Sequence, residues 1–201
     1  MAFYRKNYFC ICDGQQEEMY LDHVATLIKV FPKRVVKFNT TVGNIDLLKR
    51  TYVDYDRAAF FDHDFNDNEF QRNIILCNQF NRQRGRSTYH AFSNVNFDLW
   101  LILHKEEFNR PVFSNDAYLP DVRRIYGLGA TENIKNKRTI KKILDQITLE
   151  DVKNAISRAN RIRAEKIDTD KRMIGPTICY PNPDFSIHEF LKVVLTDCGE
   201  L

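Results

Sequence analysis

Apolar and polar residues follow two different periods along the first hundred residues. Short, almost wholly apolar runs bounded by turn residues predict buried strands of a sheet. The runs that fit this pattern are residues 3–12, 34–39, 58–61 and 88–92. The segments between them carry apolar residues at helical spacing, over residues 17–30, 41–55 and 66–82. Strands that alternate with helices in this way predict an α/β protein with an open, mostly parallel sheet flanked by helices.

The pattern changes after the fourth predicted strand. Residues 97–104 are almost wholly apolar, which predicts a buried helix. A loop with a short helix, a long helical stretch and a last apolar helix are predicted over residues 106–128, 133–172 and 186–195. We therefore divide the chain into a core of residues 1–104 and a helical, basic extension of residues 105–201, which we expect to pack together as one structural unit.

Acidic residues directly follow two of the predicted strands. The first strand leads into Asp13 and Glu17, and the third leads into Asp62 and Asp64. Ligands of parallel sheets bind just beyond the carboxyl ends of the strands, so these carboxylates converge in one crevice if the two strands are neighbours. Converging carboxylates repel one another, and a hard divalent cation with oxygen ligands, Mg²⁺ or Mn²⁺, would neutralise them. Such a site indicates phosphodiester chemistry.

Each of these acids also has a plainer interpretation. An aspartate after a strand is often the N-cap of the next helix, as Asp62 or Asp64 would be, and Asp13-Gly14 is also a turn signal. Asp98 lies within the predicted buried helix, where a carboxylate is costly unless it is paired or linked to a metal. It would then point toward the same crevice, or else cap its helix or pair with a nearby arginine.

Length and composition limit the class of protein. The chain has 201 residues, of which 43% are hydrophobic, which is enough for one good core and short for two full domains. No apolar run reaches membrane-spanning length, and Arg5 and Lys6 precede only a short apolar run, so we expect neither a transmembrane helix nor a signal peptide. Five cysteines, an odd number, include Cys10 and Cys12 within one predicted strand, where alternation places them on opposite faces and they cannot easily bridge each other, so we expect reduced thiols. These features predict a soluble, cytoplasmic protein.

The distribution of charge is more informative than its sum. A net charge of +3, from 30 basic and 27 acidic residues, does not by itself indicate nucleic acid. Basic residues gather in the second half, and the candidates for nucleic-acid contacts are Lys135, Lys137, Arg138, Arg158 and Arg161. A basic half beside an acidic crevice suits a polyanion whose scissile phosphate lies at the metal. The alternative is a solvated helix face, which is the usual meaning of such a run.

Four motifs resemble the RloB-like family. Residues 11–20 read ICDGQQEEMY, similar to the family's C-E-G-x-T-E-x-x-Y, and residues 60–64 read FFDHD, similar to its F-D-x-D. Residues 93–104 read SNVNFDLWLILH, similar to S-N-P-x-F-E-x-W-L-L-L-H. Residues 182–191 read NPDFSIHEFL, similar to the closing N-P-S-T-x-V-H. The motifs occur in the family's order over nearly the whole chain.

The resemblance implies a Toprim-type fold, the metal-dependent module that cuts nucleic acids in topoisomerases, primases and OLD-family nucleases. It also implies an effector nuclease of antiphage defence by abortive infection, encoded beside an ABC-type or AAA-type ATPase. On this pattern Glu17, Asp62 and Asp64 hold Mg²⁺ or Mn²⁺, Asp13 assists proton transfer, and Asp98 occupies a further acidic position. The target remains open between DNA and RNA, including tRNA, as does the oligomeric state.

Two departures from the pattern leave an alternative open. Asp13 and Asp98 stand where the family has Glu, and each is shorter by one methylene group. A weakly active or inactive subunit that binds nucleic acid, or senses it and regulates a partner ATPase, is therefore the competing hypothesis. A phosphatase or nucleotide hydrolase using the same acids fits less well, because the basic half favours a long polyanion.

Overall fold

A five-stranded sheet forms the centre of the molecule in the computed structural model, which describes residues 4–29, 34–50, 54–81, 85–167 and 170–201. Its strands are β1 (Tyr4–Cys12), β2 (Arg34–Val42), β3 (Asp56–Asp62), β4 (Thr88–Asn94) and β7 (Asp184–Phe185). The spatial order is β2-β1-β3-β4-β7. All pairs are parallel except β4 with β7. The predicted open, mostly parallel α/β sheet is confirmed, and it is consistent with a Toprim-like fold.

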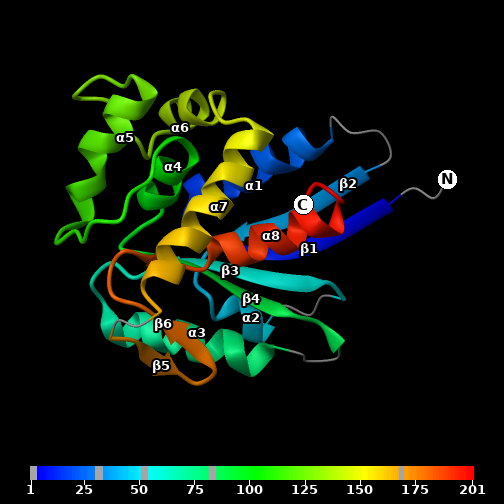
Figure 1. Ribbon diagram of the computed structural model, residues 1–201. Coiled ribbons are helices and arrows are strands. Elements are labelled where there is room, and N and C mark those ends of the chain that lie inside the picture. The colour runs from blue at the N-terminus through cyan, green and yellow to red at the C-terminus, as the bar shows by residue number, and fades with distance from the viewer. Residues whose placement is uncertain (1–3, 30–33, 51–53, 82–84, 168–169) are drawn as a thin grey trace.

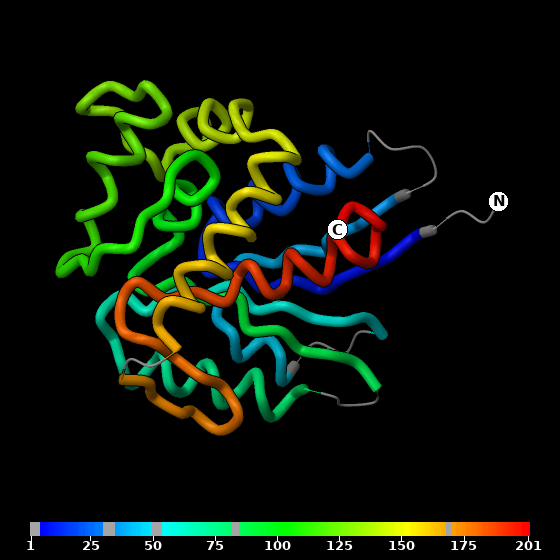
Figure 2. Tube along the Cα trace, in the orientation of Figure 1, coloured from blue at the N-terminus to red at the C-terminus, as the bar shows by residue number. Residues whose placement is uncertain are grey.

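Helices cover both faces of this sheet (Figure 1). One face carries α1 (Gln15–Ile28), α7 (Leu149–Glu165) and α8 (Ile187–Asp197). The other carries α2 (Leu47–Arg50) and α3 (Asp67–Phe80), together with the hairpin of β5 (Arg172–Ile174) and β6 (Thr177–Cys179). Figure 2 shows that the hairpin lies on the face opposite α7 and α8, although it falls between them in the sequence.

The alternation of side chains along β1 explains why two apolar layers form. Tyr8, Cys10 and Cys12 face the cluster under α1, α7 and α8, whereas Phe9 and Ile11 face the cluster under α3. All five side chains are at most 6% exposed. A strand buried on both faces reads as a continuous apolar run, which is why the sequence identified it.

The remaining helices lie at one end of the sheet. They are α4 (Asp98–Lys105), the 3₁₀ turn η2 (Asn115–Tyr118), α5 (Leu119–Tyr126) and α6 (Lys137–Leu144). The predicted buried helix is confirmed, because every residue of α4 from Leu99 to His104 is at most 1% exposed. The helix packs against α5 and α7, so the extension and the core share one apolar cluster.

One predicted helix is wrong over much of its length. The segment predicted as a helix over 41–55 begins instead as the end of β2, because the β-branched run Thr40-Thr41-Val42 favours an extended backbone. Only Leu47–Arg50 is helical among the described residues of that segment, after a turn in which Asn44 Oδ1 accepts a 2.9 Å hydrogen bond from the Asp46 backbone. The parts of the predictions that fall on residues 3, 30, 51–53, 82 and 168–169 lie outside the described residues.

Strand β7 is absent from the predicted elements. It consists of two residues, and it pairs with Ser93 and Asn94 at the end of β4. The backbone N–H of Ser186 then donates a 2.9 Å hydrogen bond to the carbonyl of Phe92. Two residues carry no periodic signal, so only the tertiary pairing reveals this strand. Within the described residues, no helix has the length and apolarity needed to cross a membrane.

Candidate metal centre

A cavity of about 570 Å³ opens at the carboxyl ends of β1 and β3. All five acidic residues predicted for the site line it, namely Asp13, Glu17, Asp62, Asp64 and Asp98. The strands β1 and β3 are parallel neighbours, with Ile11 opposite Ala59, so their ends meet at one edge of the sheet. The convergence expected from the strand order is therefore present.

Three of these carboxylates are close enough to share a cation. One oxygen each from Asp13, Asp62 and Asp64 lies within 4.8 Å of the other two. An all-oxygen, all-carboxylate donor set fits Mg²⁺ or Mn²⁺ in preference to softer metals. Glu17 was expected among the ligands, but the structure places Asp13 in this set in its stead.

Glu17 instead closes the turn that carries Asp13. Its Oε2 accepts a 3.0 Å hydrogen bond from the backbone N–H of Gly14, the N-cap residue of α1. A Cβ atom at position 14 would lie 3.1 Å from that same oxygen. Gly14 has an extended backbone that any residue can adopt, so glycine is favoured here by this close approach and not by its torsion angles. Glu17 is 5% exposed and lines the cavity together with Asp13.

The turn after β3 directs Asp64 into the cavity. Asp64 and Phe65 have φ angles of 45° and 56°, in the left-handed region that non-glycine residues rarely adopt. The backbone N–H groups of His63 and Asp64 donate hydrogen bonds of 3.0 and 3.1 Å to the carbonyl of Val95 and hold the turn in place. Unusual backbone of this kind concentrates at functional sites.

His63 does not join the carboxylates on either side of it. Its Nε2 lies 3.0 Å from Oδ1 of Asp67, and its ring packs edge-on against Phe70, with 4.9 Å between ring centroids. The interpretation of His63 as a structural residue that points away from the aspartates is confirmed by these contacts.

Asp98 enters the cavity from the first turn of α4. It is 4% exposed, and its Oδ1 accepts a 3.3 Å hydrogen bond from Nε2 of Gln16. The side chain of Asn96 accepts a 3.1 Å hydrogen bond from the Asp98 backbone and fixes the start of the helix. Asp98 therefore neither caps its own helix through its side chain nor pairs with an arginine among the described residues.

The electrostatics of the cavity follow from burial and crowding of like charges. Burial, followed by the nearby Glu17, Asp64 and Asp13, raises the pKa of Asp62 well above its ordinary value. Burial raises the pKa of Glu17 to about 7, with further contributions from Asp13 and Asp98. Burial also raises the pKa of Asp98 to about 6, and the hydrogen bond from Gln16 opposes that rise. A bound cation would reverse this balance by favouring the ionised carboxylates.

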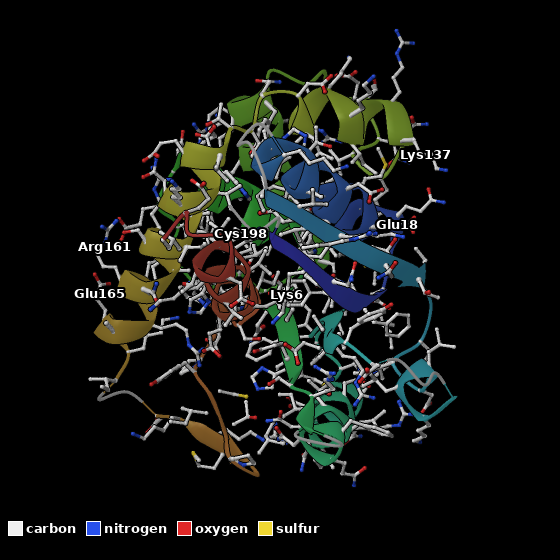
Figure 3. All side chains as sticks on the ribbon, turned by 90° about the vertical axis from the view of Figure 1, so that its right-hand side faces the viewer. Lys6, Glu18, Lys137, Arg161, Glu165 and Cys198 are labelled. Carbon is white, nitrogen blue, oxygen red and sulfur yellow. The ribbon has the colours of Figure 1, made fainter. Side chains whose placement is uncertain are left out.

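The five basic residues predicted to contact nucleic acid are in different environments. Lys135 lines the cavity, and its charge opposes the rise in the pKa of Asp64 that burial causes. Lys137 and Arg138 are exposed on α6, and Figure 3 shows Lys137 directed away from the body of the molecule. Arg158 donates hydrogen bonds of 2.8 and 3.1 Å to the carbonyls of Leu103 and His104, at the end of α4. Arg161 pairs with Glu107 on the surface of α7.

Gln16 and Arg123 line the cavity but were not among the predicted site residues. Gln16, which holds Asp98, lies within the first motif at a position where the family has Thr. Arg123 on α5 falls in a segment predicted only as loop and short helix, and no motif marks it. Only its place in the fold connects it with the acids.

Comparison with known proteins decides the family. The model of the family described as RloB-like protein matches residues 8–193, nearly the whole chain. The chain belongs to the RloB-like family. Separate comparisons with curated proteins and with solved structures gave no match. The matched region of this RloB-like protein contains every residue that lines the cavity.

Proposed function

We propose that this RloB-like protein is a metal-dependent nuclease that hydrolyses phosphodiester bonds. The observation that carries the proposal is the approach of Asp13, Asp62 and Asp64 to within 4.8 Å of one another, in a cavity that also contains Glu17 and Asp98. Carboxylates that converge in such number repel one another, and a cation or shared protons would stabilise them together. Mg²⁺ or Mn²⁺ is the cation whose preferred ligands match this set.

Each residue has a definite part in the proposed reaction. Asp13, Asp62 and Asp64 would hold the cation, and Glu17 would fix the turn that presents Asp13. The cation supplies polarisation of a phosphoryl oxygen and lowers the pKa of bound water. The water oxygen forms a bond to phosphorus as the bond from phosphorus to the leaving sugar oxygen breaks. The second carboxylate oxygen of Asp13, which is exposed and is not counted among the ligand atoms, would accept the proton of the water, and the leaving oxygen would take a proton from solvent.

The resemblance to family patterns extends the proposal to the biological setting. We propose that the nuclease is an effector of antiphage defence in the cytoplasm and acts with an ABC-type or AAA-type ATPase. All five cysteines are buried free thiols, which supports a reducing compartment. The nucleic acid is DNA or RNA, with tRNA among the candidates.

A direct assay tests the proposal. Purified protein, with and without its neighbouring ATPase, is incubated with plasmid DNA, single strands and total tRNA in Mg²⁺ and in Mn²⁺. We expect cleavage that requires the metal and that Asp62→Asn and Asp64→Asn abolish without unfolding the protein. Cleavage at the wild-type rate by either variant would remove the carboxylate site from the mechanism.

A binding or sensing subunit is the second candidate. The shorter acids Asp13 and Asp98 favour it, since each stands at a Glu position of the family pattern. The variants Asp13→Glu and Asp98→Glu separate the two functions. Gain of metal-dependent cleavage in these variants would indicate a degenerate site, whereas loss of cleavage would indicate a site already adjusted to the shorter acids.

A further inference from the structure

The five site acids lie on one side of the cavity, at the ends of β1 and β3 and in the first turns of α1 and α4. The other side carries both charges, because Asp116 and Glu132 line it together with two cations, which we call the cationic wall. Arg123 of α5 and Lys135 of the segment before α6 line the same cavity from the extension. Lys135 lies near enough to Asp13, Asp64 and Asp98 for its charge to oppose the rise in their pKa that burial causes.

The two cations have no carboxylate partner within the described part of the chain. There, neither Arg123 nor Lys135 forms an ion pair. The Nε atom of Arg123 is buried and has no hydrogen-bond partner among these residues, and its Nη2 donates only a 3.4 Å contact to the carbonyl of Glu132. A buried guanidinium N–H without a partner is costly, and an anionic oxygen is its strongest partner. By contrast, the adjacent Arg124 binds Glu106 through two hydrogen bonds of 2.7 and 2.6 Å.

The cationic wall is held in position before any ligand binds. Ile134 is 3% exposed and belongs to the main apolar cluster, which anchors the segment beside Lys135. Asn133 Oδ1 accepts a 2.9 Å hydrogen bond from the Lys135 backbone. Glu132 accepts a 2.8 Å hydrogen bond from the backbone of Gly129 and, through its carbonyl, the contact from Arg123. These contacts fix the backbone that carries Lys135, so ordering of this segment costs little when a ligand binds.

The size of the cavity limits what can enter it. A volume of about 570 Å³ is typical of a pocket for one small ligand, and roughly the size needed for one nucleotide. Protein surfaces that bind duplex DNA are broad, and about 1,000–2,500 Å² of protein surface is buried in such complexes. An unpaired nucleotide can enter a cavity of this volume whole, whereas a duplex can present only its backbone at the mouth of the cavity.

We propose that the cavity accepts an unpaired nucleotide of a single-stranded or frayed polynucleotide, and that Arg123 and Lys135 hold its phosphate opposite the carboxylates. This inference rests on the proposed nuclease function for the identity of the ligand. Arg123 supplies a planar donor group for two phosphate oxygens, and Lys135 supplies a point charge at the rim. The bases of a single strand are unpaired, so one nucleotide is not held by a partner strand. It can enter the cavity together with its phosphate.

Binding is the test, because it does not depend on cleavage. Labelled oligonucleotides of about 12 nucleotides, as single-stranded DNA, single-stranded RNA and a blunt DNA duplex, are titrated with the full chain in Ca²⁺ and followed by fluorescence anisotropy. We expect at least one single strand to bind about tenfold more tightly than the duplex. Arg123→Gln and Lys135→Gln should each weaken that binding by about tenfold.

Matched variants test whether the loss of any positive charge, at any position, weakens binding. Arg124→Gln removes an arginine one position away that faces Glu106, and Lys192→Gln removes an exposed lysine on α8 that does not line the cavity. Both should bind single strands as the wild type does, and melting temperatures check that all four variants fold. Equal binding of duplex and single strands, no binding of either, or equal losses in the Arg123 and Arg124 variants would overturn the inference.

Cleavage assays with the same oligonucleotides separate this inference from the proposed function. A preference for single strands that depends on Arg123, without cleavage in Mg²⁺ or Mn²⁺, would leave the binding site standing and refute the nuclease. Cleavage of the blunt duplex as fast as of the single strands would leave the nuclease standing and refute the preference for an unpaired nucleotide.

Discussion

Nε2 of Gln16 donates a 3.3 Å hydrogen bond to Oδ1 of Asp98 and joins the first turns of two helices that are 82 residues apart in the chain. The bond crosses the wall of the acidic cavity, in which Asp98 is 4% exposed. A single hydrogen bond from an amide does not replace the hydration of a buried carboxylate. Burial therefore raises the pKa of Asp98 to about 6, even though Gln16 opposes that rise.

The variant Asp98→Asn should stabilise the metal-free protein at high pH. The folded-state pKa of Asp98 lies above its unfolded value, so the wild type loses stability as pH rises through about 6 and this carboxyl ionises. The neutral amide of the variant has no charge to bury. At each pH the free energy of unfolding of the wild type is subtracted from that of the variant. This difference should be larger at pH 8 than at pH 5 by about 1 kcal/mol. Urea denaturation at both pH values measures it.

The matched control for that measurement is Asp116→Asn, which removes an exposed carboxylate at the rim of the same cavity. We expect no comparable pH-dependent gain from it, because burial is the main cause of the shift at Asp98. If both variants gave the same pH dependence, a general effect of net charge would replace the account based on burial.

Metal binding should stabilise the wild type and fail to stabilise the ligand variants. Mn²⁺ bound at Asp13, Asp62 and Asp64 would remove the repulsion among them. At a concentration about 100 times the dissociation constant, the melting temperature should rise by roughly 5–10 °C. Asp62→Asn should abolish this rise and leave the metal-free melting temperature at or above that of the wild type.

Asp67→Asn is the control for the metal titration. Asp67 is an exposed acid at the start of α3, near the proposed ligands in sequence, and it pairs with His63 and Arg172 outside the cavity. Its variant should keep the full rise in melting temperature. An Mn²⁺-dependent rise in Asp62→Asn as large as that of the wild type would show that the metal binds elsewhere.

The position of the acids could be predicted from the sequence because it depends on strand order. Buried parallel strands read as apolar runs, and the residues after them must lie at the carboxyl edge of the sheet. Asp13 and Asp62 are such residues, so their meeting required only that β1 and β3 be neighbours. Which carboxylates approach most closely depends on local turns. The left-handed backbone at Asp64 and the hydrogen bond from Gly14 to Glu17 have no sequence signal strong enough to distinguish Asp13 from Glu17 as a ligand.

Lys135 was among the predicted nucleic-acid contacts, but the place of Arg123 in the cationic wall could not be predicted, because it is a tertiary feature. Arg123 and Arg124 are adjacent, equally basic and on one short helix, yet only Arg123 lines the cavity. The difference arises from how α5 packs against α4, which places one side of α5 toward the acids. For the same reason Arg158, predicted from a basic run, donates instead to carbonyls at the end of α4.

Gly14→Ala should damage metal binding more than folding. The added Cβ would lie 3.1 Å from Oε2 of Glu17, so this carboxylate must move and release the turn that presents Asp13. The backbone at Gly14 is extended, so the cost in the free energy of unfolding should stay within about 1 kcal/mol. The affinity for Mn²⁺, measured by calorimetry, should fall by about tenfold, as expected when a support of a ligand is lost.

Gly129→Ala is the matched control, because its Cβ would meet its nearest neighbour, the side chain of Glu132, at 3.8 Å, an ordinary contact distance. Its affinity for Mn²⁺ should equal that of the wild type. Unchanged affinity in Gly14→Ala would mean that the position of Glu17 does not influence the metal site.

His104 should make the protein sensitive to acid. Its ring bonds two groups inside the apolar cluster, with Nδ1 2.8 Å from the carbonyl of Trp100 and Nε2 3.0 Å from the hydroxyl of Tyr20. A carbonyl only accepts, so Nδ1 carries the proton and Nε2 accepts from Tyr20. Burial lowers the pKa of His104 to about 4, because a buried imidazolium would lack hydration and would lose the bond from Tyr20.

The direction in which stability changes with pH depends on how many protons the folded and unfolded chains bind. Between pH 6.5 and 4 the unfolded chain protonates His104 and the folded chain does not, so this residue lowers stability as pH falls. His104→Gln removes that proton uptake. Its deficit in the free energy of unfolding, relative to the wild type, should therefore shrink by roughly 2–3 kcal/mol between pH 7 and pH 4.5. Tyr20→Phe keeps the imidazole, so its deficit should not shrink in this way. A deficit of His104→Gln that stays constant across this range would show that His104 titrates alike in the folded and unfolded chains.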